Sequence, residues 1–154
     1  MNFEVRPLTE DEWSLWDDFV DESPRGTLFH KSFWLEASGG RFVIYGYFRG
    51  KELYAGIPLS YRLRLGIKVA SQPNLTPYSG VLFKERDAKY VSKLSAEKEA
   101  SRKIAQRLKS DFPLVHFGFS PGPVDLQPFI WEGFSPSIMY TYIIQPNKGL
   151  EDVW

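Results

Sequence analysis

The 154-residue sequence contains no cysteine, which excludes disulfide bonds and thiol nucleophiles and disfavours the usual structural zinc sites. No run of apolar residues approaches the roughly 18 needed to cross a membrane, and residues 1–6 are too short and too polar for a signal peptide. The 19 basic residues balance the 19 acidic ones, so the chain lacks the positive excess that is typical of DNA-binding proteins. We therefore expect a cytoplasmic protein with no membrane span and no DNA partner.

Several catalytic motifs are also missing. The sequence has no HExxH zinc motif, no GxSxG nucleophile turn, and neither of the glycine-rich phosphate loops GxxxxGK[ST] and GxGxxG. The acidic residues Asp17, Asp18, Asp21 and Glu22 fall on the solvent side of a predicted helix, where they indicate a solvated face rather than a metal site. No metal ligands are predicted.

Aromatic residues are abundant, at 16 % of the chain, and indicate a folded domain with a substantial core. Alternating and apolar runs predict strands, while an apolar repeat of three to four residues predicts helices. The strands are expected at 3–6, 42–48, 53–63, 81–83, 114–119 and 137–144. The helices are expected between Thr9 and Ser23, from about Thr27 to Ala37, over 87–111 with an effective start near Ser95, and over 124–131.

Local signals refine two of these elements. Thr9 and Glu12 have the spacing of a capping box, which marks the start of the first helix. Pro58 lies inside the second strand of a predicted hairpin and indicates either a bulge or a locally free edge.

The predicted order of elements is typical of an α+β (mixed α/β) fold, with helices packed on a largely antiparallel sheet. We assign 1–149 to a single domain. Residues 150–154 have the pattern of a helix that is just beginning.

Two groups of residues could carry chemistry. Each histidine, His30 or His116, could be a general base in a cleft or a hydrogen-bonded structural residue. The polar segment 72–80 contains Asn74 and Tyr78 between prolines and a glycine. It could present these side chains to a ligand, or it could be a surface connection that satisfies its own backbone.

Three blocks together resemble the N-terminal domain of FemAB-like proteins, which are tandem transferases of the GNAT superfamily. The blocks are PRGTLFHKSFWLEA at 24–37, GIPL at 56–59 and QPNLTPYSG at 72–80. The resemblance implies a GNAT-like twisted mixed sheet with helices on both faces. Residues 150–154 are similar to the start of the linker helix into the second domain. The resemblance implies transfer of an acyl or aminoacyl group to a small-molecule or peptide-like amine.

The same resemblance suggests which residues contact the acceptor. These candidate substrate-binding residues are Arg25, His30, Lys31, Trp34, Asn74 and Tyr78. Peptidoglycan-bridge members of the family have a lysine after the tryptophan that corresponds to Trp34. This chain has none there, which disfavours a UDP-linked cell-wall precursor.

The donor side is not recognisable. A GNAT-type pyrophosphate turn has the pattern [QR]xxGx[GA] before a helix, and the nearest segment, 62–68, predicts a hairpin turn instead. We therefore expect no cofactor in this chain. Acyl-CoA or aminoacyl-tRNA would be the donor only with a second GNAT domain or a dimer partner.

Three functions remain open. The chain could be the substrate-side part of an acyltransferase or a non-catalytic GNAT-like binding module. A third possibility is contact with tRNA through Arg62, Arg64 and Lys68, which the zero net charge makes weaker. No residue is assigned as catalytic.

Overall fold

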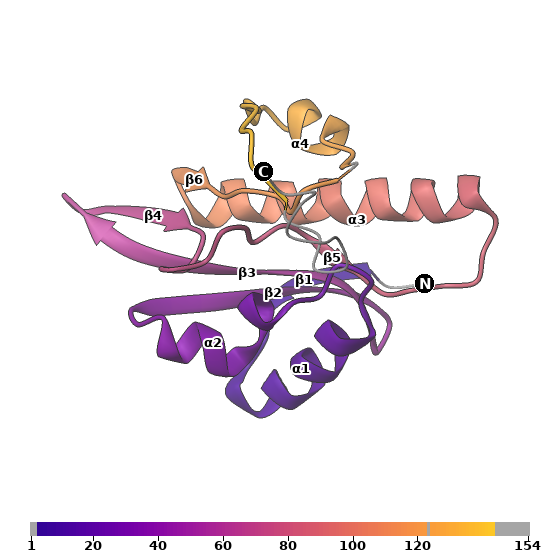
Figure 1. Ribbon diagram of the computed structural model, residues 1–154, viewed down its shortest axis with the longest axis horizontal. Helices are drawn as coiled ribbons and strands as arrows, with labels where there is room; N and C mark the ends of the chain where they lie inside the picture. The colour runs from indigo at the N-terminus through magenta and orange to yellow at the C-terminus, as the bar shows by residue number, and fades with distance from the viewer. Residues whose placement is uncertain (1–2, 123, 144–154) are drawn as a thin grey trace, which may run out of the picture.

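The computed structural model describes residues 3–122 and 124–143 as one sheet with helices on both faces (Figure 1). The strands are β1 (Phe3–Pro7), β2 (Arg41–Arg49), β3 (Glu52–Arg64), β4 (Ile67–Ser71), β5 (Leu82–Phe83) and β6 (Leu114–His116). The α-helices are α1 (Trp13–Glu22), α2 (Ser32–Ala37), α3 (Tyr90–Asp111) and α4 (Gln127–Trp131), and the 3-10 helices are η1 (Glu10–Glu12) and η2 (Leu28–His30).

The six-stranded sheet has the order β1-β2-β3-β4-β6, and β5 pairs with a separate stretch of β3. All pairings are antiparallel except β4 with β6, which are parallel and joined through α3. The α+β fold class with a GNAT-like mixed sheet is confirmed. Helices α1 and α2 cover one face, α3 covers the other, and α4 packs against α3 (Figure 1).

The two faces of the sheet carry separate hydrophobic clusters. On the α1 side, Trp16, Leu35 and Ile44 are almost fully buried, whereas Tyr45 faces the α3 side with Ile104. Ile44 and Tyr45 are consecutive in β2, so their side chains point to opposite faces. Burying each such side chain contributes roughly 1.5–3 kcal/mol. This explains why β2 and β3 are apolar through their middle residues instead of alternating.

The predicted capping box is confirmed. The backbone N–H of Thr9 donates to the Glu12 carboxylate at 3.0 Å, and Arg6 pairs with the same carboxylate at 2.6 Å. The arginine hydrogen bond lowers the pKa of Glu12 to about 2. These contacts fix the passage from β1 into α1.

Pro58 lies where β3 has a partner on one side only. It pairs with Ile44 of β2, and its other edge falls between the stretches of β3 that pair with β5 and with β4. There the Ser79 hydroxyl donates to the Pro58 carbonyl in place of a strand. The alternative of a locally free edge is confirmed.

Three helix predictions differ from the structure. The helix expected from Thr27 is divided, because Lys31 is extended (ψ 146°) between η2 and α2. Helix α3 begins at Tyr90, earlier than its apolar face suggests, and α4 occupies only the end of the range 124–131.

Two strand predictions also differ. Strand β6 ends at His116 because its partner β4 ends at Ser71, so the following residues have no parallel neighbour. Residues 137–143 form no strand. Ile144 and the predicted helix start at 150–154 lie outside the described residues. In the parts of the chain described, no helix has both the length and the apolar character of a membrane span.

Candidate functional site

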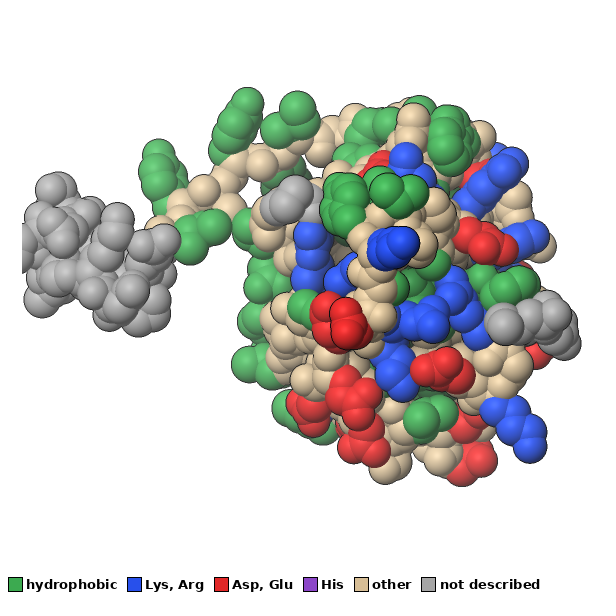
Figure 2. All heavy atoms as spheres, turned by 90° about the vertical axis from the view of Figure 1, so that its right-hand side faces the viewer, with side chains coloured by type: hydrophobic (Ala, Val, Ile, Leu, Met, Phe, Trp, Pro, Cys, Tyr) green, Lys and Arg blue, Asp and Glu red, His purple; other side chains and the backbone are tan. Residues whose placement is uncertain are grey.

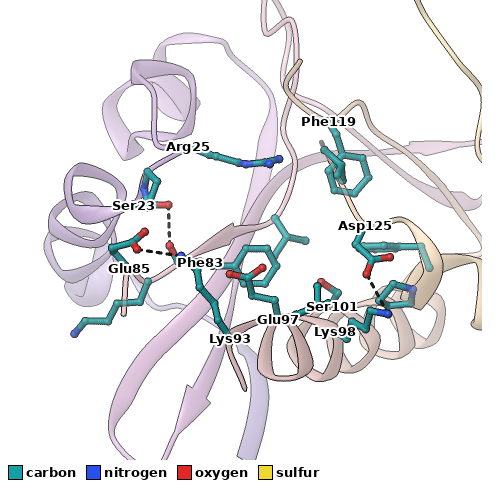
Figure 3. Close-up of a pocket in the computed structure, with 17 residues that line it drawn as sticks. Ser23, Arg25, Phe83, Glu85, Lys93, Glu97, Lys98, Ser101, Phe119 and Asp125 are labelled. Atoms are coloured by element: carbon teal, nitrogen blue, oxygen red, sulfur yellow. Dashed lines mark hydrogen bonds and ion pairs between the residues drawn. The ribbon is translucent and has the colours of Figure 1, made fainter. Parts of the chain in front are cut away.

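A cavity of about 240 Å³ opens beside the N-terminal half of α3 (Figure 3). Its other walls are β5, the turn that follows α1, and the segment between β6 and α4. These four segments are distant in sequence, and Figure 3 shows their side chains converging on one space.

The cavity exists because one face of α3 changes character along its length. Toward the C-terminus, Ala100, Ile104 and Leu108 pack on the sheet and are fully buried. Toward the N-terminus, the positions one and two turns earlier on that face are Glu97 and Lys93, which line the cavity. A helix face that is apolar over the sheet therefore becomes polar over the cavity.

Aromatic side chains form the apolar part of the wall. Phe119 packs edge-on against Phe129, with ring centroids 5.5 Å apart, and Phe83 of β5 also lines the cavity. Phe119 can approach closely because residue 80 is glycine: an added Cβ would lie 2.6 Å from the Phe119 ring. Gly80 therefore determines how this side of the cavity closes.

Most charges at the cavity rim are neutralised in pairs. Lys93 contacts Glu85 at 3.0 Å, and Lys98 contacts Asp125 at 3.4 Å (Figure 3). Lys84 pairs with Glu52 at 3.1 Å. These exposed ion pairs contribute little to stability, but they define a rim of alternating charge.

Glu97 differs from its neighbours. Among the described residues, none donates a hydrogen bond to its carboxylate and none forms an ion pair with it. Burial raises the pKa of Glu97, while the nearby positive charges of Lys93 and Arg25 oppose this shift. A carboxylate with a raised pKa in a cavity is suited to receive a proton or to bind a cation.

Of the six predicted substrate-binding residues, Arg25 lines this cavity. Its side chain extends from the turn after α1 toward Phe119 (Figure 3). The other five lie elsewhere, around η2, α2 and the segment 72–80.

His30 is buried, with 1 % of its surface exposed. Its Nδ1 lies 2.9 Å from the Thr27 hydroxyl, and its carbonyl accepts a hydrogen bond from Trp16 at 2.6 Å. Burial lowers the pKa of His30 to about 4. These contacts agree with the structural alternative for this histidine, whereas His116 is exposed on β6.

Lys31 connects α1 with the start of α2. Its ammonium group contacts the Asp21 carboxylate at 2.5 Å and the Asp17 carbonyl at 3.0 Å. The Asp17 carboxylate in turn accepts bonds from the backbone and hydroxyl of Ser32, at 2.7 and 2.6 Å. Lys31 therefore has partners within the fold.

The structure brings Trp34, Asn74 and Tyr78 together. The Trp34 indole donates to the Thr76 hydroxyl at 2.9 Å, and Asn74 donates to the Ser38 carbonyl at 3.2 Å. Phe29 lies between the rings of Trp34 and Tyr78, with centroids 5.1 and 6.1 Å away. These contacts fasten the polar segment to α2, and a role in acceptor binding stays a prediction.

Sequence reasoning did not identify Glu97. A signal was present, because Glu97 precedes the apolar row Ala100, Ile104 and Leu108 by one helical turn on the same face. A charged residue at a position expected to be buried indicates either a cavity or a partner.

In the ranges 3–122 and 124–143, no three histidine or acidic side chains are grouped as metal ligands. No protein-family model matches the sequence, and no curated protein matches it. Solved structures do match.

An aminoglycoside 6'-N-acetyltransferase, AAC(6')-Ih from Acinetobacter baumannii, superposes with a TM-score of 0.52 at 14 % identity. The match covers 96 % of this chain and 100 % of that one. This chain has the GNAT fold. A transcriptional regulator from Bacillus halodurans C-125 gives the same TM-score at 15 % identity, covering 94 % of this chain and 100 % of that one.

Among the described residues, neither the segment that leads into α3 nor the β3–β4 turn has the form of a GNAT-type pyrophosphate turn. Residues 84–89, which lead into α3, include no glycine and therefore lack the closely approachable backbone that such a turn uses. The segment 62–68 is the β3–β4 hairpin, in which Leu65 and Gly66 adopt φ values of 51° and 78°. The hairpin prediction is confirmed.

Proposed function

We propose that this chain is the acceptor-side domain of an N-acyltransferase and that its amine acceptor enters the cavity beside α3. The observation that carries this proposal is the Glu97 carboxylate, which lines the cavity without a hydrogen-bond or ion-pair partner among the described residues. The GNAT fold and the resemblance to FemAB-like proteins support the reaction class.

The cavity favours a narrow acceptor. Its volume of about 240 Å³ is below the usual range of whole small-molecule sites and suits a single alkyl or peptide side chain. Phe83, Phe119 and Phe129 provide apolar walls for the carbon stem, while Glu97 provides the polar contact for its end. A primary amine on an alkyl stem, as in a lysine side chain, meets both requirements.

The chemistry assigned to Glu97 is proton transfer. An amine is bound mainly as its ammonium ion, which cannot attack a carbonyl until one N–H proton is removed. Glu97 first pairs with the ammonium group and then accepts that proton, leaving the nitrogen lone pair free. A half-buried position strengthens this pairing because water screens it less.

The role proposed for Glu97 does not include binding of the acyl donor. Since residues 84–89 do not suit a pyrophosphate, we derive no step through acyl-CoA. An acyl or aminoacyl donor would be held by a second GNAT domain or by a partner chain, as in the tandem arrangement of FemAB-like proteins. That second domain or partner chain would determine whether the donor is acyl-CoA or aminoacyl-tRNA.

Binding of a model acceptor tests the proposal without a donor. We expect Nα-acetyl-lysine amide to bind this chain measurably in a calorimetric or NMR titration. Its norleucine analogue, which lacks the amine, should bind at least about tenfold more weakly, a difference of about 1.4 kcal/mol.

The variant Glu97→Gln tests the assigned residue. It should lose the preference for the amine, whereas Glu99→Gln, an exposed site on the same helix, should keep it. Equal binding of both ligands by the unaltered chain would remove the amine acceptor and favour the non-catalytic binding module.

A further inference from the structure

Residues 137–143 carry an unusual amount of exposed apolar surface. Five of their side chains are between 69 % and 100 % exposed, namely Ile138, Met139, Tyr140, Tyr142 and Ile143. Figure 2 shows a row of hydrophobic side chains on a segment that leaves the body of the molecule. Scattered apolar residues on a surface are ordinary, but a continuous row indicates a contact site.

The composition of this segment is that of an interior strand. Isoleucine, tyrosine and threonine all favour extended structure. In an extended chain, Ile138, Tyr140 and Tyr142 point to one face, and Met139, Thr141 and Ile143 point to the other. Because both faces are largely apolar, pairing of the segment with a sheet edge would remove apolar surface from water.

The outer edge of β6 is open to an added strand such as segment 137–143. Strand β6 pairs with β4 along one side, and along its other side no strand of the described residues is paired with it. Leu114, the first residue of β6, is 57 % exposed. This exposure, together with that of His116, shows that one face of β6 is uncovered, whereas Val115 packs on the α3 side. An open strand edge with one covered face is a setting in which an added strand is stabilised by backbone hydrogen bonds.

We propose that segment 137–143 of one copy adds as a strand to the β6 edge of a second copy, which returns its own segment to the first. The segment leaves the body of the molecule (Figure 2), and no strand of the described residues pairs with the outer edge of β6, which is therefore open to the partner. The exchange has two-fold symmetry, and it covers both segments and both edges in one closed dimer.

The area involved is adequate for a stable dimer. A buried aromatic side chain covers roughly 150–250 Å², so the two tyrosines of each segment alone bring on the order of 600–1,000 Å². The two isoleucines and the methionine of each segment add to this. The total approaches the roughly 1,600 Å² of a standard interface.

The mass of the full 154-residue chain in solution is the first test. Light scattering over a wide range of protein concentrations should give twice 17.8 kDa. Tyr140→Pro, which removes a ladder hydrogen bond and fixes the backbone, should give 17.8 kDa. Leu65→Lys, a change at an equally exposed apolar residue in the β3–β4 turn, should leave the dimer intact. A monomeric unaltered chain would overturn the proposal.

A mixing experiment identifies the surfaces. His116→Pro alters the β6 edge and leaves the segment intact, so it should also be monomeric alone. Mixed with Tyr140→Pro, it should form a heterodimer held by the one remaining segment–edge pair. If His116→Pro still dimerises, the segments associate with each other and the exchange is excluded. Leu114→Lys serves as the edge variant if circular dichroism shows that His116→Pro is unfolded.

Discussion

Two polar regions of this molecule differ in what their polar groups do. The segment 72–80 is rich in hydrogen-bonding side chains, and its contacts join it to α2 and to the rest of the fold. The cavity beside α3 is lined by charged side chains, and one of them, Glu97, has no such partner among the described residues. Polar content therefore predicts a site less well than a half-buried charged group that no other described side chain pairs with.

The largest expected effect is the loss of stability in acid that His30 of η2 causes. His30 is buried as the neutral ring with a pKa of about 4, against an ordinary value of 6.5, so the unfolded chain binds a proton that the folded chain does not. With respect to this histidine, the free energy of unfolding is therefore highest above pH 6.5. It decreases by about 3 kcal/mol as the pH falls toward 4.

Chemical denaturation between pH 4 and 7 measures this loss for His30. The variant His30→Gln should flatten the acid side of the profile, whereas His116→Gln should retain it. An unchanged acid profile in His30→Gln would show that other groups cause the loss.

Gly80 lies at the border between the two regions, so an alanine there should affect both. The added methyl group would lie within 2.6 Å of the Phe119 ring, and moving that ring disturbs the cavity wall. We expect Gly80→Ala to cost about 1–3 kcal/mol in the free energy of unfolding and to weaken amine binding. Gly39→Ala, at a glycine with no neighbouring atom within 4 Å and a φ of 75°, gives the contrasting case in which backbone strain acts without crowding.

Trp34→Phe should affect the first region alone. The change removes the indole donor to Thr76 and keeps an aromatic ring against Phe29. A loss of about 1 kcal/mol in thermal or denaturant unfolding is expected, with amine binding unchanged. A clear loss of binding would instead support the predicted acceptor contact at Trp34.

The smallest expected effect is a gain in the free energy of unfolding, for the variant Glu97→Gln. Burial raises the pKa of Glu97, so at neutral pH its charge is less favourable in the folded chain than in the unfolded one. Glu97→Gln should therefore increase the unfolding free energy at pH 7 by less than about 1 kcal/mol while it removes amine selectivity. Glu99→Gln should change neither quantity, and a destabilised Glu97→Gln would indicate a structural role for this carboxylate.

Much of the fold could be predicted from local signals. The capping box, the β2–β3 and β3–β4 hairpins and the apolar face of α3 depend on residues close in sequence, where spacing is informative. Strand ends were less predictable. Strand β6 ends where its partner β4 ends, and the sequence of 114–119 carries no information about the length of β4. The split at Lys31 has the same origin, since α2 begins where Asp17 of another helix caps it.

The candidate site was less accessible to prediction. Its walls come from the turn after α1, β5, α3 and the residues around Phe119, so no single stretch carries its pattern. Arg25 was predicted through the family resemblance, whereas Glu97 became visible only when the helix face could be placed over the cavity. For His30 the residue type left two alternatives open, and its burial agrees with the structural one.

The tip of the β3–β4 hairpin is a suitable position for a site-specific label. Leu65 is 98 % exposed at the turn, and the hairpin extends beyond the helices in Figure 1. Because the chain has no cysteine, Leu65→Cys would create a single thiol for a fluorophore or a spin label. A reporter there would record self-association and tumbling from a position away from the cavity lining.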